Sequence, residues 1–183
     1  MIDIINEGIV FKVSDDHKVQ TELFDDIGVL VVDNFYKNPD LVRKLIDDIP
    51  ATTHTNRGGY PAAAINVSYN MQPVVETYRH YIQTYFPNCL SDDYITSIMS
   101  QASFMVNVMQ SDGNEYLPPH TDCPSTTNLA SGIFLNTPEN CSGGTSFFKD
   151  NKYLGYVKMK YNRMILYHQN VQHTAFMDYN SFV

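Results

Sequence analysis

The tripeptide His120-Thr121-Asp122, followed 51 residues after the aspartate by His173, is the feature that most constrains the fold of this chain. Two imidazoles and one carboxylate can bind a divalent transition metal on one face and leave coordination positions open on the other. On a strand, residues two apart point to the same side, with Cα atoms about 6–7 Å apart, so His120 and Asp122 can hold one ion. The third ligand must then come from another strand. The spacing therefore predicts a β-barrel or sandwich rather than a helical metal site.

The same spacing also arises by chance in a chain that contains 6 His and 20 acidic residues. The alternative interpretation is a surface His-Thr-Asp turn, together with a half-buried His173 that is only hydrogen-bonded. Spacing alone leaves both interpretations open, because a metal site also needs a matching structural context. The sequence around the motif has to decide between them.

Length and composition indicate one globular domain, residues 1–183, of a size that buries its own core. Hydrophobic residues make up 43% and charged residues 17% of the chain, which is typical of a globular protein. The net charge of −8 argues against a nucleic-acid or anionic-membrane surface. No apolar run approaches the about 20 residues of a membrane span, and the N-terminus does not have the pattern of a signal peptide. We expect a cytoplasmic protein with no nucleic-acid or membrane partner.

The cysteines Cys89, Cys123 and Cys141 are odd in number and form no CxxC pair. This pattern suits a reducing compartment and argues against a disulfide framework. Cys123 directly follows Asp122 and could approach a metal. We expect it instead to be a small buried residue, because free cysteine often behaves as a small hydrophobe.

Residues 1–92 form a mixed helical and strand part. The β-branched run Ile27–Asp33 predicts a strand. A helix is predicted for Pro39–Ile49, because a proline at the first helical position is followed by apolar residues spaced four apart. The expected buried face of that helix consists of Leu41, Leu45 and Ile49.

The next stretch, residues 51–72, shows no clear period and is predicted to be a loop, of the kind that forms a lid or contacts a substrate. A second helix is predicted for Pro73–Phe86, which ends before a proline. The residues expected on its buried face are Val74, Tyr78, Ile82 and Tyr85.

Residues 93–183 consist of short strand-like segments separated by turns. Strands at regular spacing, in a chain whose helices come first, indicate an α+β fold. Its core would be an antiparallel double sheet of jelly-roll type, with the N-terminal helices packed on it. The predicted strands are Ser103–Val108, Ala130–Asn136, Thr145–Lys149, Tyr153–Met159 and Arg163–Tyr167.

Four patterns in this second part, over roughly residues 101–176, resemble one enzyme family. They are a strand, glycine turn and aromatic before His-x-Asp (FMVNVMQSDGNEYLPPHTD), a strand ending in Leu-Asn (GIFLN), a double-glycine turn (GGTSFF), and an apolar strand ending in an aromatic before His173 (NRMILY). In this order they are similar to the double-stranded β-helix oxygenases that use 2-oxoglutarate and Fe(II), in the prolyl-4-hydroxylase-like branch. The early stretch VLVVDNFYKNPDLVRKLI resembles an uncharacterised subgroup of that branch.

The resemblance implies that His120, Asp122 and His173 bind Fe(II), while the cosubstrate 2-oxoglutarate and dioxygen occupy the open positions. It implies a dioxygenase that couples oxidative decarboxylation of 2-oxoglutarate to hydroxylation of a C–H bond. The substrate would be a small molecule or a peptide, with a peptidyl or free amino acid suggested by family analogy alone. The family's distal histidine follows a turn, so we expect His173 rather than His168 to be the ligand.

Two departures from the family concern the cosubstrate. The family places a Lys or Arg about ten residues after the distal histidine, near Phe182-Val183 in this chain, and no cation stands there. A missing last strand, a different cation or a different metalloenzyme would each explain this, and Arg163 and Lys149 are the candidate substitutes. The family's tyrosine before the glycine turn is replaced by Met109, and Tyr116 could supply a phenol instead.

Two other functional classes therefore stay open. One is a cupin-like metal-dependent enzyme that needs no 2-oxoglutarate, and the other is a non-catalytic jelly-roll binding protein. If the last strand is missing, an exposed sheet edge near residues 174–183 favours pairing with a second chain, which would give a homodimer.

Overall fold

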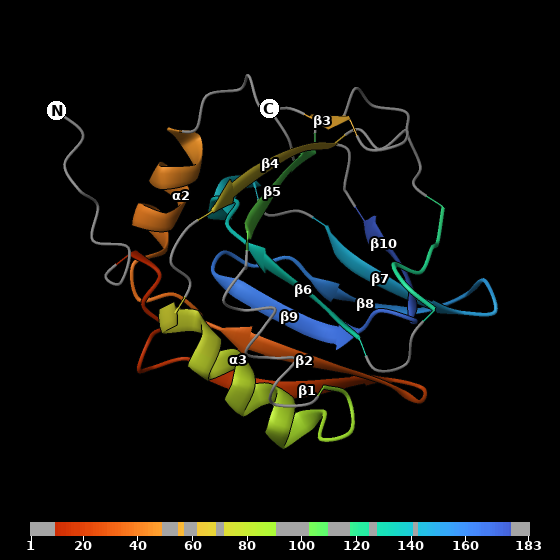
Figure 1. The fold of residues 1–183 in the computed structure, drawn as a ribbon. Helices are drawn as coiled ribbons and strands as arrows, with labels where there is room; N and C mark the ends of the chain where they lie inside the picture. The colour runs from red at the N-terminus through yellow and green to blue at the C-terminus, as the bar shows by residue number, and fades with distance from the viewer. Residues whose placement is uncertain are drawn as a thin grey trace, which may run out of the picture. The chain divides into compact units, whose positions relative to one another are not determined.

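The computed structural model describes residues 10–48, 55–56, 62–68, 72–90, 103–109, 118–124, 128–140 and 143–176 (Figure 1). The chain divides into two compact units. The first unit contains Met1–Asp15 and Tyr36–Gln110, and the second contains Asp16–Phe35 and Ser111–Val183. Helices and antiparallel sheets occur together, which confirms the predicted α+β class. None of the described helices is long and apolar enough to cross a membrane.

Among its described residues, the first unit contains the helices α2 (Pro39–Asp47) and α3 (Gln72–Tyr85) and a three-stranded antiparallel sheet. Both helices lie close to the predicted ranges. The strand order of its sheet is β3-β4-β5, with bounds Thr55–Asn56, Ala62–Ser68 and Ser103–Met109. The predicted loop over residues 51–72 is therefore wrong where β3 and β4 form. An alanine-rich strand such as β4 has weak intrinsic β-propensity, and pairing along all of β5 compensates for it.

The buried faces of the two helices differ from the prediction. In α2 the buried residues are Val42 and Leu45, whereas Leu41 is exposed; Ile49 lies outside the described residues. In α3 the predicted Val74 and Ile82 are buried, whereas Tyr78 is half-buried and Tyr85 is exposed. The apolar spacing gave the correct period, and packing selected a buried stripe that only partly overlaps the predicted one. The buried residues of α3 are Val74, Val75, Tyr81 and Ile82.

The second unit consists of two antiparallel sheets. The four-stranded sheet has the order β1-β2-β9-β6, and the three-stranded sheet has the order β10-β7-β8. The bounds of these strands are β1 Lys18–Phe24, β2 Ile27–Asp33, β6 Leu129–Phe134, β7 Gly144–Lys149, β8 Lys152–Lys158, β9 Arg163–His168 and β10 Gln172–Phe176. A short 3-10 helix, Pro138–Asn140, lies between β6 and β7.

Side chains from both sheets of this unit form one core. It contains Val29 and Val31 from β2, Phe147 from β7, and Ile165 and Tyr167 from β9, together with Ala130 and Val157. Because strand side chains alternate, every second residue of β9 faces this core. In this arrangement Tyr167, near the C-terminal end of β9, lies beside His173 on β10.

A tight turn and a glycine fix the register of the β7–β8 hairpin. Asp150 and Asn151, between β7 and β8, both have positive φ values of 51° and 61°. Two such residues are typical of a type I′ turn, whose twist matches that of the flanking strands. A Cβ at Gly144 would collide with the carbonyl of Val157, so the β7–β8 pair needs glycine there. This local chemistry explains why the boundaries of β7 and β8 were predicted to within a residue.

The strand predicted at Ile27–Asp33 forms as expected, but its partner was not predicted. Within the second unit it pairs with β9 and with β1, a strand that the sequence analysis missed. The signal for β1 is the Asp25-Asp26 turn between two runs of similar length, with Asp25 at a φ of 60°. The sequence division at residue 92 had assigned β2 to the N-terminal part.

Candidate metal centre

His120 and His173 face each other as a hydrogen-bonded antiparallel pair. The amide of His120 donates to the carbonyl of His173 at 3.0 Å, and the amide of His173 donates to the carbonyl of His120 at 2.9 Å. Directly opposed residues of an antiparallel pair carry their side chains on the same face. This bridge adds His120 to the edge of β10 and places both imidazoles on one side of the three-stranded sheet.

The turn after β9 positions Asp122. The carbonyl of Gln169 accepts hydrogen bonds from the amides of Asp122, at 3.2 Å, and Cys123, at 3.4 Å. The amide of Gln169 donates in turn to the carbonyl of Asn128 at 3.0 Å. The segment that carries the aspartate is thus fastened to the turn that leads to His173.

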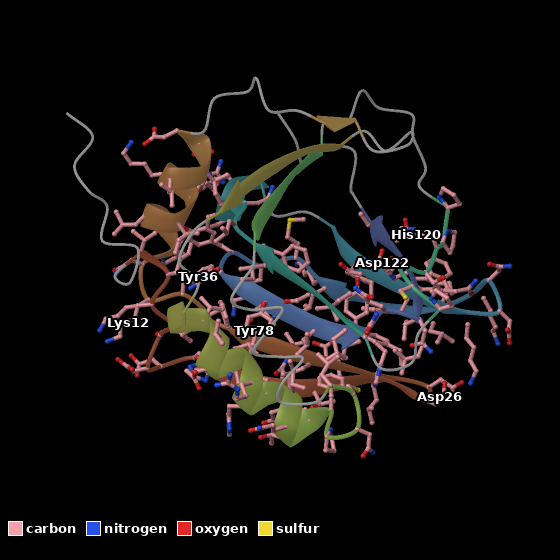
Figure 2. The ribbon with its side chains drawn as sticks, in the orientation of Figure 1. Lys12, Asp26, Tyr36, Tyr78, His120 and Asp122 are labelled. Atoms are coloured by element: carbon pink, nitrogen blue, oxygen red, sulfur yellow. The ribbon has the colours of Figure 1, made fainter. Side chains whose placement is uncertain are left out.

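The three side chains converge on one point. Figure 2 labels two of them, His120 and Asp122, which lie close together. Asp122 Oδ1 lies 3.8 Å from His120 Nε2, and Asp122 Oδ2 lies 3.7 Å from His173 Nε2. All three ligand atoms lie within 4.8 Å of one another. Metal–ligand bonds of about 2.0–2.2 Å place neighbouring donor atoms about 3 Å apart. Small side-chain movements would therefore let one divalent ion bind all three, and the donor set fits a divalent transition metal.

Both imidazoles are oriented by the same local contact. His120 Nδ1 lies 3.2 Å from the carbonyl oxygen of Pro118, and His173 Nδ1 lies 3.0 Å from that of Val171. A carbonyl oxygen only accepts, so each Nδ1 carries the hydrogen and donates it. Each Nε2 then presents its lone pair toward Asp122, which is the tautomer that a metal-binding histidine needs.

The centre is buried on one side and open on the other. The side chain of His173 is 10% exposed, whereas those of His120 and Asp122 are 28% and 41% exposed. Burial is the largest effect on His173 and lowers its pKa; His120 also lowers it, while the Val171 carbonyl and Asp122 oppose the shift. A lowered pKa favours the neutral imidazole, which is the form that binds metal.

An aromatic side chain from the other sheet contacts the centre. The ring of Tyr167 lies edge-on to that of His173, with centroids 5.0 Å apart, and packs against Phe147 at 5.1 Å. The sequence analysis gave Tyr167 no role, although it ends the strand before the distal histidine. Through Tyr167 the four-stranded sheet contacts His173, one of the three candidate ligands.

Comparison with known families supplies a family assignment without a function. A family model described as "Family of unknown function (DUF6445)" matches residues 16–154. The chain belongs to DUF6445. The match covers His120 and Asp122 of this DUF6445 member, whereas His173 lies beyond it. No curated protein and no solved structure matches the chain.

The structure distinguishes the two late histidines of this DUF6445 protein. His173 belongs to the cluster, whereas His168 ends β9 opposite Leu129 in the four-stranded sheet. Cys123 is half-buried, with its sulfur 3.7 Å from the side-chain nitrogen of Asn128, and it is not one of the converging ligands.

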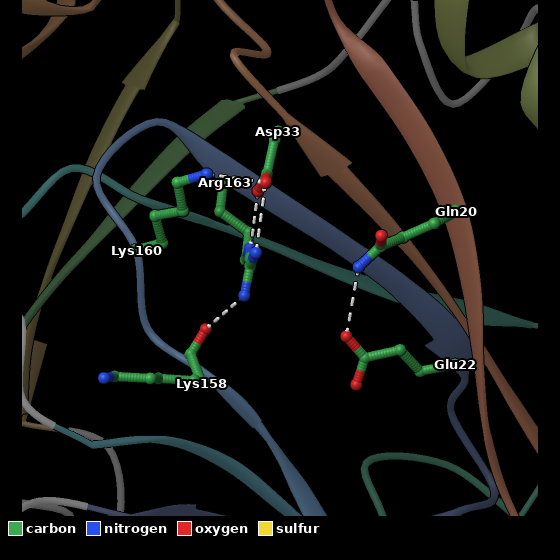
Figure 3. A network of polar contacts seen from close by, with 6 residues as sticks. All are labelled: Gln20, Glu22, Asp33, Lys158, Lys160 and Arg163. Carbon is green, nitrogen blue, oxygen red and sulfur yellow. Dashed lines mark hydrogen bonds and ion pairs between the residues drawn. The ribbon is translucent and has the colours of Figure 1, made fainter.

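Both cations considered for the cosubstrate already have carboxylate partners. Arg163 binds Asp33 through Nε at 2.6 Å and Nη2 at 3.1 Å, and its Nη1 donates to the carbonyl of Lys158 at 2.9 Å (Figure 3). Lys149 pairs with Asp25 at 3.3 Å and with Asp26 at 2.8 Å. A role for Arg163 in cosubstrate binding stays a prediction. Tyr116, the other predicted cosubstrate residue, lies outside the described residues.

Proposed function

We propose that this chain is a mononuclear non-haem Fe(II) dioxygenase that uses 2-oxoglutarate and hydroxylates a C–H bond of a small molecule or a peptidyl or free amino acid. Its metal ligands would be His120, Asp122 and His173. The observation that carries the proposal is the convergence of two oriented Nε2 atoms and one carboxylate on a single point. A cytoplasmic location and a homodimer stay predictions.

Electrostatics favours a bound cation at this point. The carboxylate oxygens of Asp122 and the two Nε2 lone pairs are all hydrogen-bond acceptors, and they face one another at 3.7–3.8 Å. With a lone pair on each Nε2, the imidazoles contribute no positive charge that would offset the carboxylate, so a bound cation would supply it. A divalent ion would bind all of these groups at once, and two histidines with one carboxylate leave three positions for other ligands.

The strand pairing of the second unit supports a double-stranded β-helix as its finer fold. The β7–β8 hairpin lies inside the β6–β9 pair in sequence, and that pair lies inside the His120–His173 bridge. Successive pairs alternate between the three-stranded and the four-stranded sheet. Such nesting is what a long antiparallel hairpin produces when it wraps into a jelly roll.

In this proposal the protein supplies geometry and exclusion of water. Val171 and Pro118 hold the imidazoles through their carbonyl groups, and the Gln169 carbonyl holds the backbone beside Asp122. Bound Fe(II) would supply the chemistry of dioxygen activation, coupled to decarboxylation of 2-oxoglutarate. The more exposed Asp122 side is where we place the entry of cosubstrate and substrate.

One observation favours a second candidate, a metal-dependent enzyme of this fold without 2-oxoglutarate. Recognition of the distal carboxylate of 2-oxoglutarate normally uses a cation. Arg163 and Lys149, the two cations considered for this role, are engaged by aspartates. The enzyme without 2-oxoglutarate would keep the same three metal ligands. It would differ only in the molecule that occupies the open metal positions.

Calorimetric titration of 2-oxoglutarate into Mn(II)-loaded protein without oxygen tests the proposal. We expect metal-dependent binding that is lost in His120→Ala and kept in His168→Ala, a matched control that removes a histidine outside the cluster. Mn(II) binding without 2-oxoglutarate binding would favour the second candidate. Absence of Mn(II) binding in the unmodified protein would contradict both.

A further inference from the structure

Tyr167 places a phenol beside the candidate metal centre. It lies opposite Ala130 in the β6–β9 pair, faces the core between the two sheets and is only 6% exposed. Its ring contacts that of the ligand His173 at a centroid distance of 5.0 Å and an interplanar angle of 67°. Of the core residues, it is the one from the four-stranded sheet whose ring meets a candidate ligand.

The hydroxyl of Tyr167 can donate a hydrogen bond to a ligand of the candidate centre. Buried tyrosines normally find a hydrogen-bond partner for the hydroxyl group. Within the described part of the chain, no hydrogen bond to the Tyr167 hydroxyl is formed. A tyrosine phenol is protonated at neutral pH and can donate a hydrogen bond. Tyr167 therefore brings a neutral donor to the side of the candidate centre.

We propose that Tyr167 is a ligand-binding residue of the metal centre, whose hydroxyl donates a hydrogen bond to an oxygen of a carboxylate bound at the open metal positions. This inference rests on the proposed metal site and names the residue that recognises the acid end of its ligand. The ligand class is a small carboxylic acid that chelates the metal, such as a 2-oxo acid or oxalate.

The metal-binding end of the ligand suits this donor better than the distal end. The ring of Tyr167 contacts that of His173, which places this side chain beside a proposed metal ligand. Arg163 stands four residues earlier on β9, about 13 Å away along a strand. A neutral phenol can donate to a carboxylate oxygen beside Asp122 without adding a second charge, and such a charge-assisted bond is short and strong.

Calorimetry on Mn(II)-loaded Tyr167→Phe, with oxalate and 2-oxoglutarate as probes, tests the inference. The phenylalanine keeps the ring contacts with Phe147 and His173, so we expect unchanged Mn(II) affinity. Both acids should bind about tenfold more weakly, the loss typical of one hydrogen bond to a charged group. The matched control is Tyr153→Phe, which removes an exposed phenol from β8 and should leave both affinities unchanged.

Several results would overturn the inference. Unchanged oxalate affinity in Tyr167→Phe would show that the hydroxyl does not touch the ligand. Parallel loss of Mn(II) and oxalate affinity would assign Tyr167 to packing of His173 instead, and a wild-type centre that binds Mn(II) but no oxalate would also contradict it. If the wild type binds oxalate but not 2-oxoglutarate, the proposed cosubstrate is wrong and the comparison of oxalate affinities still decides the role of Tyr167.

Discussion

A carboxylate lies near each end of β9, and the two carboxylates have different partners. At the first end, Asp33 receives hydrogen bonds from Arg163 and Lys160, with N···O distances of 2.6–3.1 Å. At the other end, past Tyr167, Asp122 faces two imidazole nitrogens at 3.7 and 3.8 Å. Each end has one carboxylate with two nitrogen-bearing partners.

The two ends differ in whether the partners of the carboxylate are charged hydrogen-bond donors or imidazole acceptors. The guanidinium and ammonium groups carry positive charge and donate hydrogen bonds, so Asp33 is satisfied within the protein and its pKa is lowered, mainly by Arg163. The two histidines present lone pairs toward Asp122 because their Nδ1 hydrogens go to backbone carbonyls. The first end therefore stabilises the fold by itself, whereas we propose that the second end is completed by a bound cation.

The largest expected effect is on metal affinity, which should depend on Asp122 but not on Asp33. Asp122→Ala removes a direct ligand, and we expect the Mn(II) affinity to fall by more than about 100-fold, since loss of an outer-shell partner alone costs about 10–100-fold. Asp33→Ala should leave it within about threefold, as the distant ion pair does not touch the centre. Calorimetric titration measures both, and equal losses in the two variants would remove the proposed distinction.

In stability the order of the two variants should be reversed, with the larger loss of unfolding free energy in Asp33→Ala. Asp33 and Arg163 have side chains only 17% and 13% exposed, so Asp33→Ala leaves a half-buried guanidinium without its partner. We expect the free energy of unfolding to fall by about 2–3 kcal/mol. Metal-free Asp122→Ala should not be destabilised, because it relieves the crowding of acceptors around the centre. Urea unfolding of the metal-free proteins gives both values; a larger loss for Asp122→Ala would contradict the comparison.

The contribution of Asp33 to stability should depend on pH in one direction. Its folded-state pKa lies below the ordinary value of 3.8. The stabilisation is therefore complete above the unfolded-state pKa and is lost as the pH falls through the folded-state value. We expect the difference in unfolding free energy between wild type and Asp33→Ala to be constant from about pH 7 to pH 5 and to shrink below about pH 4. A difference that grows on acidification would be inconsistent with the ion pair.

The smallest effect is expected for Lys149, the other cation considered for the cosubstrate. Its pairs with Asp25 and Asp26 are exposed to solvent. Exposed ion pairs contribute little, because water and salt screen them. Lys149→Ala should leave both the urea midpoint and the affinity for 2-oxoglutarate unchanged. A selective loss of 2-oxoglutarate affinity would instead identify Lys149 as the missing cosubstrate cation.

The local chemistry of the sequence predicted one end of β9 better than the other. His120, Asp122 and His173 could be chosen from residue type and from the turn before the distal histidine, and the structure brings them together. The strand expected to carry both His120 and Asp122 does not form, because His120 makes only an isolated bridge and Asp122 lies in a bend. The contacts that orient the two imidazoles depend on backbone carbonyl directions, which the sequence does not encode in any readable pattern. Arg163 and Asp33 are 130 residues apart, so only the β2–β9 pairing, a tertiary feature, could identify them as partners.

The strands show the same division between local and tertiary information. β7 and β8 are bounded by Gly, Asp and Asn residues with defined backbone conformations, and their ranges were predicted closely. β4 lacks β-branched residues in its first half, and its pairing with β5 was not visible in the sequence. Turn chemistry is local and can be read directly, whereas the choice of strand partner depends on the whole fold.

An anomalous-diffraction experiment on crystals grown with Mn(II) tests the central claim most directly. The account predicts one strong peak bonded to His120 Nε2, to a carboxylate oxygen of Asp122 and to His173 Nε2, at about 2.0–2.2 Å from each. The Asp33–Arg163 end should show no peak. An ion at another place, or none in crystals whose Mn(II) concentration saturates the protein in solution, would contradict the proposed metal centre.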